Sequence, residues 1–319
     1  MSHPLVSVCI PVYNVERYIE RCAVSVLNQS YPSIECIFVD DCTPDASLTI
    51  LTKILGRYPS RKDQVKIIRH EKNRGLSAAR NTALSNSSGD FVIHVDSDDY
   101  LDIHAVENLV RKQKETDADI VTGQAVCIEA ESAWVMERPH FKTREGFIAD
   151  MIKPSIHHTI WGRLIRKSLY TDNGVKAKEG INIGEDLQVM SQLAYYAGKV
   201  ESIWDVVYFY DCTNDFSYMN QYDTRHIKRQ LQDTESMEVV RDFFKGKDVL
   251  LHDCSEKYLF QYYVNLLRYY GKAGKKEEFT KIRNQMSSLL PQNRKMSKRQ
   301  AIKYLSYQLF RIAERFKHN

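Results

Sequence analysis

The sequence predicts an α/β fold in which helices cover both faces of a mainly parallel β-sheet, giving a three-layer sandwich. Four short runs rich in β-branched and other apolar residues occupy residues 5–13, 34–40, 65–69 and 91–95, and their composition is typical of strands buried on both faces. Between them, apolar residues recur at the three-and-four spacing of one helix face. Strands that alternate with helices form right-handed βαβ units, in which the strands run parallel.

The helical patterns fall between and after these strands. The first places Ile19, Cys22 and Val26 on one face, and the others lie at residues 48–55, 76–84 and 106–110. In an open sheet of this kind, ligands bind outside the carboxyl ends of the strands. We therefore expect the functional residues in the loops that follow the strands.

The second half of the chain follows a looser pattern. Residues 120–128 and 200–210 are strand-like, and they bracket a loop-rich stretch that contains a helix over about residues 185–196. From about residue 221 the pattern is helical to the end, with breaks near glycines and a proline. We therefore expect a sheet-containing domain over residues 1–220 and a helical C-terminal region over residues 221–319.

Charge is distributed unevenly along the 319 residues. The net charge of +4 hides a tail, residues 271–319, that carries 13 Lys and Arg against 3 Glu. Within it, residues 298–319 place Leu305, Leu309 and Ile312 on one stripe flanked by basic residues, the pattern of a basic amphipathic helix that can lie on an anionic membrane surface. The alternative is that this stripe packs on the protein itself or on a second subunit, as in a homo-oligomer.

Composition disfavours several classes of protein. No apolar run approaches the ~18 residues needed to span a bilayer, and the N-terminus lacks the basic region and cleavage site of a signal peptide. The seven cysteines are odd in number and show no C-x-x-C pair, so we expect reduced, mostly buried thiols in a cytoplasmic protein. No nucleic-acid-binding module is recognisable, so we expect no nucleic-acid partner.

Polar residues follow each of the four predicted strands at the same end. A single such motif has a structural alternative, because Asp45 could cap a helix and Gly75 could supply a turn. All four together indicate one binding crevice at the carboxyl edge of the sheet. The segments are Pro11-Val12-Tyr13-Asn14, Asp40-Asp41, residues 73–81 and Asp96-Ser97-Asp98-Asp99.

The acidic segment after the fourth strand is the most specific feature of this edge. Asp96, Asp98 and Asp99 lie within four residues, and neighbouring carboxylates repel one another unless a cation neutralises them. Their hard oxygen ligands suit Mg²⁺ or Mn²⁺. The alternative is an exposed acidic turn that leads into the next helix.

Seven short motifs resemble, in order and spacing, those of one protein family. Residues 5–210 resemble the inverting, nucleotide-sugar-dependent glycosyltransferases of family two. This family has the GT-A fold, which is a Rossmann-like three-layer sandwich. The motifs are Val8-Cys9-Ile10-Pro11-Val12-Tyr13-Asn14, Val24-Ser25-Val26-Leu27-Asn28-Gln29, Phe38-Val39-Asp40-Asp41, Asn73-Arg74-Gly75-Leu76-Ser77-Ala78-Ala79-Arg80-Asn81, Ser88-Gly89-Asp90, His94-Val95-Asp96-Ser97-Asp98-Asp99 and Gly184-Glu185-Asp186-Leu187.

The resemblance implies roles for five residues in binding the nucleotide sugar. Pro11, Tyr13 and Asn14 would line the nucleotide pocket. Asp41 would hydrogen-bond the base, and Arg80 would reach the phosphates.

Four acidic residues would carry the metal and the chemistry. Asp96 would contact the ribose or the metal, and Asp98 would ligate a Mn²⁺ or Mg²⁺ ion that bridges the diphosphate. Asp186 would be the catalytic base, with Glu185 beside it to orient the base or the acceptor. From spacing alone, Asp186 could equally be a helix cap or a first-turn acid favoured by the helix dipole.

The activity implied by the resemblance is the inverting transfer of a sugar from a UDP-sugar to a hydroxyl of a glycan or lipid-linked glycan, as in cell-surface polysaccharide synthesis. Residues 1–120 would form the nucleotide-sugar half of the catalytic domain and residues 121–220 the acceptor half. We expect a cytoplasmic enzyme, located at the inner face of the membrane if residues 298–319 bind lipid.

Two positions depart from the common pattern of the family. Arg163 stands where many relatives have lysine, and both side chains are cationic. Asp211 follows Tyr208-Phe209-Tyr210 where relatives often have arginine. A contact made by that arginine must therefore come from elsewhere in this chain.

Two other functions stay open at this point. A sugar-phosphate nucleotidylyltransferase would need a Gly-rich basic loop after the first strand, which Pro11-Val12-Tyr13-Asn14 does not supply. A non-catalytic sugar-nucleotide-binding protein is disfavoured by the intact Asp96, Asp98 and Asp186, but Asp211 keeps it open.

Overall fold

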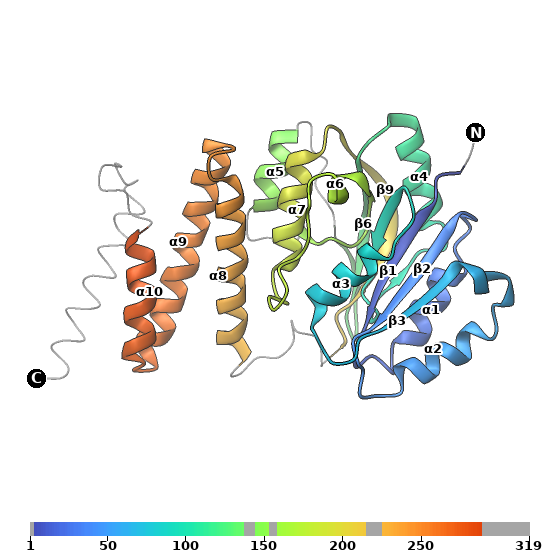
Figure 1. Cartoon of the computed structure of the whole chain (residues 1–319), viewed down its shortest axis with the longest axis horizontal. Helices are drawn as coiled ribbons and strands as arrows, with labels where there is room; N and C mark the ends of the chain where they lie inside the picture. Colours follow the sequence, from blue (N-terminus) through green and yellow to red (C-terminus); the bar gives the residue numbers. More distant parts are fainter. Residues whose placement is uncertain (1–2, 137–143, 153–157, 215–224, 289–319) are drawn as a thin grey trace, which may run out of the picture. The chain divides into compact units, whose positions relative to one another are not determined.

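The computed structural model describes residues 3–136, 144–152, 158–214 and 225–288. It divides into two compact units, residues 1–265 and residues 266–319. The first unit contains a nine-stranded sheet in the order β3-β2-β1-β4-β8-β6-β9-β5, with β7 paired to β6 (Figure 1). The strands are β1 (Val6–Val12), β2 (Ile34–Asp40), β3 (Val65–Arg69), β4 (Phe91–His94), β5 (Tyr100–Leu101), β6 (Ile120–Ile128), β7 (Ala133–Met136), β8 (Arg163–Arg166) and β9 (Val200–Asp211).

Helices of the first unit cover both faces of this sheet. Val6, Val8 and Ile10 of β1 alternate toward a core that includes residues of α1, α2 and α4. The other face carries α3, which packs on β1 and β2. The helices that lie wholly in the first unit are α1 (Ile19–Leu27), α2 (Ser47–Leu55), η1 (Pro59–Gln64), α3 (Leu76–Ser85), α4 (Ala105–Thr116), α5 (Arg144–Ile152), α6 (Ser168–Thr171), α7 (Glu185–Tyr196) and α8 (Arg225–Phe244). Helix α9 (Val249–Lys272) begins in the first unit and ends in the second.

This arrangement confirms the predicted three-layer α/β class. The pairs β1–β2, β2–β3, β1–β4 and β6–β9 are parallel, whereas β8 pairs antiparallel to both β4 and β6. The expectation that all four N-terminal strands are buried on both faces is wrong for β3. This strand lies at the edge of the sheet, and its Ile67 is 40% exposed.

The helical C-terminal region is also confirmed where the structure describes it. Helices α8 and α9 end close to the predicted breaks, at Phe244 and Lys272. The second unit is described over residues 266–288 and includes the last turns of α9 and helix α10 (Lys276–Ser288), with Tyr270 and Met286 buried. The predicted amphipathic helix over residues 298–319 lies outside the described residues. The proposed domain boundary at residue 220 stays a prediction.

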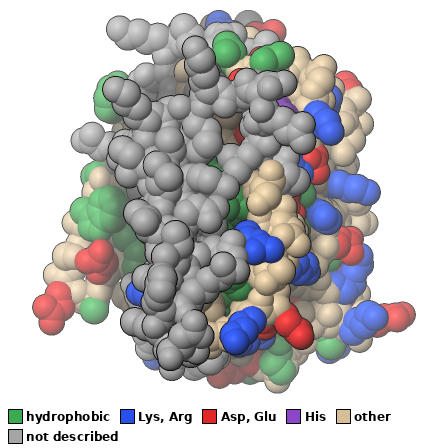
Figure 2. Space-filling view, turned by 90° about the vertical axis from the view of Figure 1, so that its left-hand side faces the viewer, with side chains coloured by type: hydrophobic (Ala, Val, Ile, Leu, Met, Phe, Trp, Pro, Cys, Tyr) green, Lys and Arg blue, Asp and Glu red, His purple; other side chains and the backbone are tan. Residues whose placement is uncertain are grey.

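None of the helices that the structure describes is long and apolar enough to span a bilayer. On the face drawn in Figure 2, Lys and Arg side chains lie among Asp and Glu side chains. The described part of that face therefore carries both signs of charge.

One expectation about the cysteines is corrected. Cys127 of β6 and Cys212, directly after β9, form a disulfide, so not all seven thiols are free. Strands β6 and β9 are neighbours and bring the two Cα atoms to 6.5 Å, within the range that a disulfide can bridge. The sequence gives no sign of this pairing because the two cysteines are 85 residues apart. Cys9, Cys22 and Cys36 are free and buried, as expected.

A buried glutamate joins the strands at their amino-terminal ends. Glu35 of β2 accepts hydrogen bonds from Ser7 Oγ of β1 at 2.6 Å and from Lys66 Nζ of β3 at 2.8 Å. It also accepts from the backbone amides of Ser88 and Gly89, just before β4. Burial alone would raise the pKa of Glu35, but these hydrogen bonds outweigh it and lower the pKa to about 2.

We predict that Glu35→Gln lowers the free energy of unfolding by about 2–3 kcal/mol near neutral pH, because buried donors lose a charged acceptor. A folded-state pKa below the ordinary value of 4.5 means that the stabilisation is present above that value and is lost as the pH falls toward 2. The difference between wild type and variant should therefore shrink on acidification. Urea unfolding at neutral pH and at about pH 3 measures both effects.

The matched control is Glu20→Gln, because Glu20 pairs with Arg57 where both side chains are more than half exposed. We expect this change to cost under about 1 kcal/mol. A difference between wild type and Glu35→Gln that stays constant with pH would assign the effect to packing rather than to charge.

Candidate active site

A single buried arginine gathers three carboxylates at the carboxyl edge of the parallel strands. Arg80 of α3 is only 5% exposed. Its Nη2 donates to Asp96 Oδ1 at 2.7 Å, just after β4. Its Nη1 donates to Glu185 Oε1 and to Asp186 Oδ1, both at 2.5 Å, in the first turn of α7. Two acidic segments that are 89 residues apart in the sequence, from Asp96 to Glu185, therefore share one cation.

The charges in this cluster do not balance. Burial alone would lower the pKa of Arg80, but the charges of Asp186, Asp96 and Glu185 outweigh it and raise that pKa well above its ordinary value. Burial raises the pKa of Glu185, and the nearby Arg80 only partly offsets it. Glu185 therefore takes up a proton more readily than an ordinary glutamate, while Arg80 stays charged.

The backbone before α7 explains why both acids point to Arg80. Gly184 has a φ of +75°, a conformation that disfavours other residues, and a Cβ atom there would lie 2.9 Å from Ser236 Oγ. The acids that follow occupy the first helical turn, where the helix dipole favours negative charge. The second carboxylate oxygen of Asp186 accepts the amide of Ile160 at 3.1 Å, so that this side chain is held from two sides.

Two anchors hold the acidic loop after β4. Asp99 is fully buried and accepts the hydroxyl of Tyr208 at 2.7 Å and the amide of Asp211 at 2.8 Å. The Tyr208 oxygen in turn accepts the amide of Asp96 at 3.1 Å. Asp99 therefore anchors the loop, although the sequence alone groups it with its acidic neighbours. From the sequence, Tyr208 is expected to be a strand residue that packs the sheet, because a tyrosine within a strand shows no sign that its hydroxyl fixes a loop.

Asp98 is the acid of this loop that best fits a cation. Its Oδ2 accepts Asn214 Nδ2 at 2.9 Å. Burial and the nearby Asp96 raise the pKa of Asp98 to about 6, so the protein alone stabilises the negative charge of this carboxylate poorly. Carboxylate oxygens are the ligands that Mg²⁺ and Mn²⁺ prefer. Asp98 and Asp96 thus fit a divalent cation by their charge and by their chemistry.

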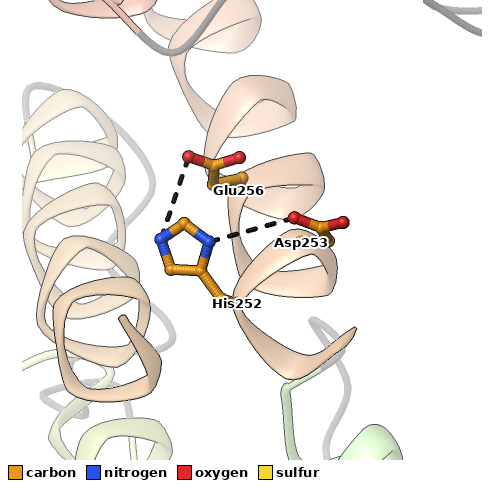
Figure 3. Close-up of side chains that lie close together, drawn as sticks. All are labelled: His252, Asp253 and Glu256. Carbon is orange, nitrogen blue, oxygen red and sulfur yellow. Dashed lines mark ion pairs between the residues drawn. The ribbon is translucent and has the colours of Figure 1, made fainter. Parts of the chain in front are cut away.

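A second group of potential ligands lies on α9, away from this loop in sequence. His252, Asp253 and Glu256 offer ligand atoms within 4.8 Å of one another, and the histidine ring nitrogens are each 3.9 Å from one of the carboxylates (Figure 3). Ion pairs between half-buried side chains account for this cluster.

The expected nucleotide-binding residues lie at the ends of β1 and β2. Pro11 is buried within β1, and Tyr13, at 44% exposed, reaches solvent just after it. The amide of Asn14 binds Thr43 Oγ1 at 2.8 Å, so the loops after the two strands contact each other.

Asp41 fixes the turn that begins α3. Its Oδ1 accepts His70 Nδ1 at 2.6 Å and the amide of Arg74 at 2.9 Å, and its Oδ2 accepts the amide of Gly75 at 2.7 Å. Gly75 has a φ of +87°, and a Cβ atom there would lie 2.4 Å from Asn182 Nδ2. The buried Asp41 therefore sets the direction of the helix that carries Arg80.

Arg163, one of the two departures from the family pattern, faces the protein interior. It is 2% exposed, and its guanidinium donates to Thr159 O and to Thr122 Oγ1. Burial lowers the pKa of Arg163 to about 10, which leaves it charged at neutral pH. Both of these acceptors are neutral oxygens of the protein.

Comparison with known sequences shows what the chain is similar to. The model of the family "Glycosyl transferase family 2" matches residues 7–172, just over half of the chain. The glycosyltransferase EpsJ of Bacillus subtilis is 28% identical over 241 residues, covering 72% of this chain and 68% of that protein. A poly(ribitol-phosphate) beta-glucosyltransferase of Bacillus spizizenii is 32% identical over 219 residues, which are 67% of this chain and 33% of the relative.

The glycosyltransferase GlyA of Streptococcus pneumoniae is 42% identical over 118 residues, which are 37% of this chain and 16% of the relative. The chain thus matches only a third or less of the length of two of these three relatives.

Solved structures share the fold. Residues 1–349 of S. aureus TarS, in complex with UDP-GlcNAc, align with a TM-score of 0.60 and 17% identity over 92% of this chain and 95% of that one. The mannosyltransferase PcManGT from Pyrobaculum calidifontis, in complex with GDP-Man and Mn²⁺, aligns with a TM-score of 0.56 and 18% identity, over 99% and 87% of the two chains. At these identities the similarity shows the architecture alone.

Proposed function

The chain belongs to glycosyl transferase family 2, and we propose that it transfers a sugar from a nucleotide-diphosphate sugar to a hydroxyl of a glycan or lipid-linked glycan, with inversion at the anomeric carbon. The family membership confirms the resemblance drawn from the seven motifs. The observation that carries the proposal is the shared guanidinium of Arg80, which holds Asp96 from one loop and Glu185 and Asp186 from another at a single site.

Asp186 is the proposed catalytic base. In a single displacement, the acceptor hydroxyl oxygen bonds to the anomeric carbon, its proton passes to the Asp186 carboxylate, and the bond to the diphosphate oxygen breaks with its electron pair. The contacts from Arg80 and from the amide of Ile160 hold the carboxylate in one orientation, which favours a base that must meet the acceptor in a fixed geometry.

Glu185 and Arg80 support that base in this proposal. Glu185 shares Nη1 of Arg80 with Asp186, so it limits how far the guanidinium can shift toward either acid. Both terminal nitrogens of Arg80 already hold carboxylates. These contacts use three of the five N–H donors of the guanidinium, so a contact to the donor phosphates would come from the second hydrogen of Nη2.

We propose that Asp98, together with Asp96, holds a Mn²⁺ or Mg²⁺ ion. A divalent cation bound there would act as a Lewis acid that stabilises the charge developing on the departing diphosphate. The protein's own contribution is the loop: Asn214 orients the Asp98 carboxylate, and Tyr208 and Asp99 fix the backbone around it. A fold neighbour in complex with Mn²⁺ supports this choice of metal.

We propose UDP as the nucleotide and cell-surface polysaccharide synthesis as the setting. TarS, which shares the fold, was solved with UDP-GlcNAc, and one relative is a glucosyltransferase of poly(ribitol phosphate). Pro11, Tyr13 and Asn14 would line the nucleotide pocket at the ends of β1 and β2, and Asp41 would hydrogen-bond the base. The reaction would take place in the cytoplasm, and residues 298–319 would contact an anionic membrane surface.

We predict that Asp186→Asn lowers sugar transfer by about 10³-fold, because the amide cannot accept the hydroxyl proton, while donor affinity changes by less than about twofold. Nucleotide release from a panel of UDP-sugars with glycan acceptors measures transfer, and calorimetry with UDP measures donor binding. Asp172→Asn, at an exposed position after α6, is the matched control.

Retained turnover in Asp186→Asn would reassign the base. If wild-type protein binds UDP-sugars yet transfers nothing to any acceptor of the panel, the non-catalytic alternative replaces this proposal.

We predict further that Mn²⁺ strengthens UDP binding to the wild type by about tenfold or more, and that Asp98→Ala removes this gain because a hard oxygen ligand is lost. Calorimetric titration of UDP with and without MnCl₂ measures the difference. His252→Ala, which disrupts the α9 cluster, should keep the full metal dependence. The reverse pattern, with dependence lost in His252→Ala and kept in Asp98→Ala, would move the metal site to α9.

A further inference from the structure

An arginine on α1 binds the acidic loop and Asp211 at the same time. Nη2 of Arg21 donates to Asp211 Oδ2 at 2.5 Å and to the backbone oxygen of Asp98 at 2.8 Å. Asp98 is the proposed metal ligand, and Asp211 stands where the family often has arginine. The two residues of the ion pair are 190 positions apart in the chain.

Asp211 is firmly held on its other sides. Its side chain is 4% exposed, and its Oδ1 accepts both the amide and the hydroxyl of Thr213, at 2.8 and 2.6 Å. Its own amide donates to Asp99 Oδ1 at 2.8 Å. Any shift of Asp211 would therefore move the residue next to Asp98.

Arg21 is also confined by aromatic rings. Its guanidinium carbon lies 4.5 Å from the centre of the Tyr100 ring, and Tyr100 stacks on Phe209 with ring centres 4.6 Å apart and planes 8° from parallel. A guanidinium over an aromatic face is attracted to it and loses little further freedom when it forms hydrogen bonds. Arg21 is thus pre-organised between α1, the acidic loop and β9.

The Arg21–Asp211 pair also explains how this chain tolerates an aspartate at position 211, where relatives often have arginine. An arginine at position 211 would place a second guanidinium against Arg21, and like charges at that distance repel. With Asp211 present, the positive charge at this place is the guanidinium of Arg21 on α1. Asp211, rather than Asp98, neutralises that charge. The negative charge of Asp98 therefore stays available to a metal ion.

We propose that Arg21 and Asp211 form a positioning pair that holds the backbone of Asp98 in the orientation that binds the divalent cation. This inference rests on the proposed metal role of Asp98. Neither residue need touch the metal or the sugar. The pair acts through Asp98 and Asp99, as residues that orient metal ligands do, and loss of such contacts typically weakens metal binding by about 10–100-fold.

The test is the affinity of the UDP-bound protein for Mn²⁺, measured by calorimetry on the full chain. We expect Arg21→Gln and Asp211→Asn each to weaken Mn²⁺ binding by about tenfold or more. Arg21→Lys should give an affinity between those of the wild type and Arg21→Gln, because an ammonium group can replace the one nitrogen that makes both hydrogen bonds but not the stacking on Tyr100. In a transfer assay, saturating Mn²⁺ should restore kcat to the single variants, because the base Asp186 is untouched.

Controls separate this role from a loss of stability. Arg57→Gln removes an arginine from an exposed pair and should leave Mn²⁺ affinity unchanged. If a single variant fails to fold, the double variant Arg21→Gln/Asp211→Asn leaves no unpaired charge and replaces it in the titration. A merely structural role would lower the melting temperature of the variants while Mn²⁺ affinity stays at the wild-type value.

The outcomes distinguish this inference from the proposed function. Wild-type protein that binds Mn²⁺, together with Arg21→Gln and Asp211→Asn proteins that bind it equally well, overturns the positioning pair alone. Wild-type UDP complex that binds no Mn²⁺ overturns the metal site itself, and the pair falls with it.

Discussion

One buried guanidinium organises the functional end of this molecule. Taking an arginine out of water is costly unless carboxylates accept its hydrogen bonds, and Arg80 meets this condition with Asp96, Glu185 and Asp186. The dependence also runs the other way, since three carboxylates packed together would repel one another without a cation among them. The acids proposed for chemistry are therefore the same groups that make the burial of Arg80 possible. Stability and the proposed activity therefore depend on the same residues.

A few fixed turns elsewhere in the fold place Arg80 and its carboxylate partners next to one another. Asp41 binds the amides of Arg74 and Gly75 and so sets the start of α3, while Gly184 sets the start of α7. At the opposite end of the sheet, Glu35 joins the parallel strands through buried hydrogen bonds. One end of the sheet is thus fixed by internal pairing, and the other carries more acids than its arginines neutralise. That excess is the physical basis for expecting a bound cation.

Much of this was predictable because it depends on local patterns. Strand β2 and helix α7 begin and end where the apolar periodicity predicts, and the acids of the site follow strands or open a helix. Arg80 was expected at the site, but its place at the centre of three carboxylates was not, because the partners come from distant segments. The Arg21–Asp211 pair, the Cys127–Cys212 disulfide and the hydrogen bond from the Tyr208 hydroxyl to Asp99 could not be predicted for the same reason. Burial of β3 was overestimated because composition does not reveal which strand lies at an edge.

The most direct test of the central claim is anomalous diffraction from crystals of the full chain soaked with MnCl₂ and UDP. The account predicts a manganese peak bound by the carboxylate of Asp98, beside Asp96 and on the side of the molecule where Arg80 holds Asp186. A peak at the histidine cluster of α9 with none at Asp98, or a nucleotide bound far from Asp186, would contradict it.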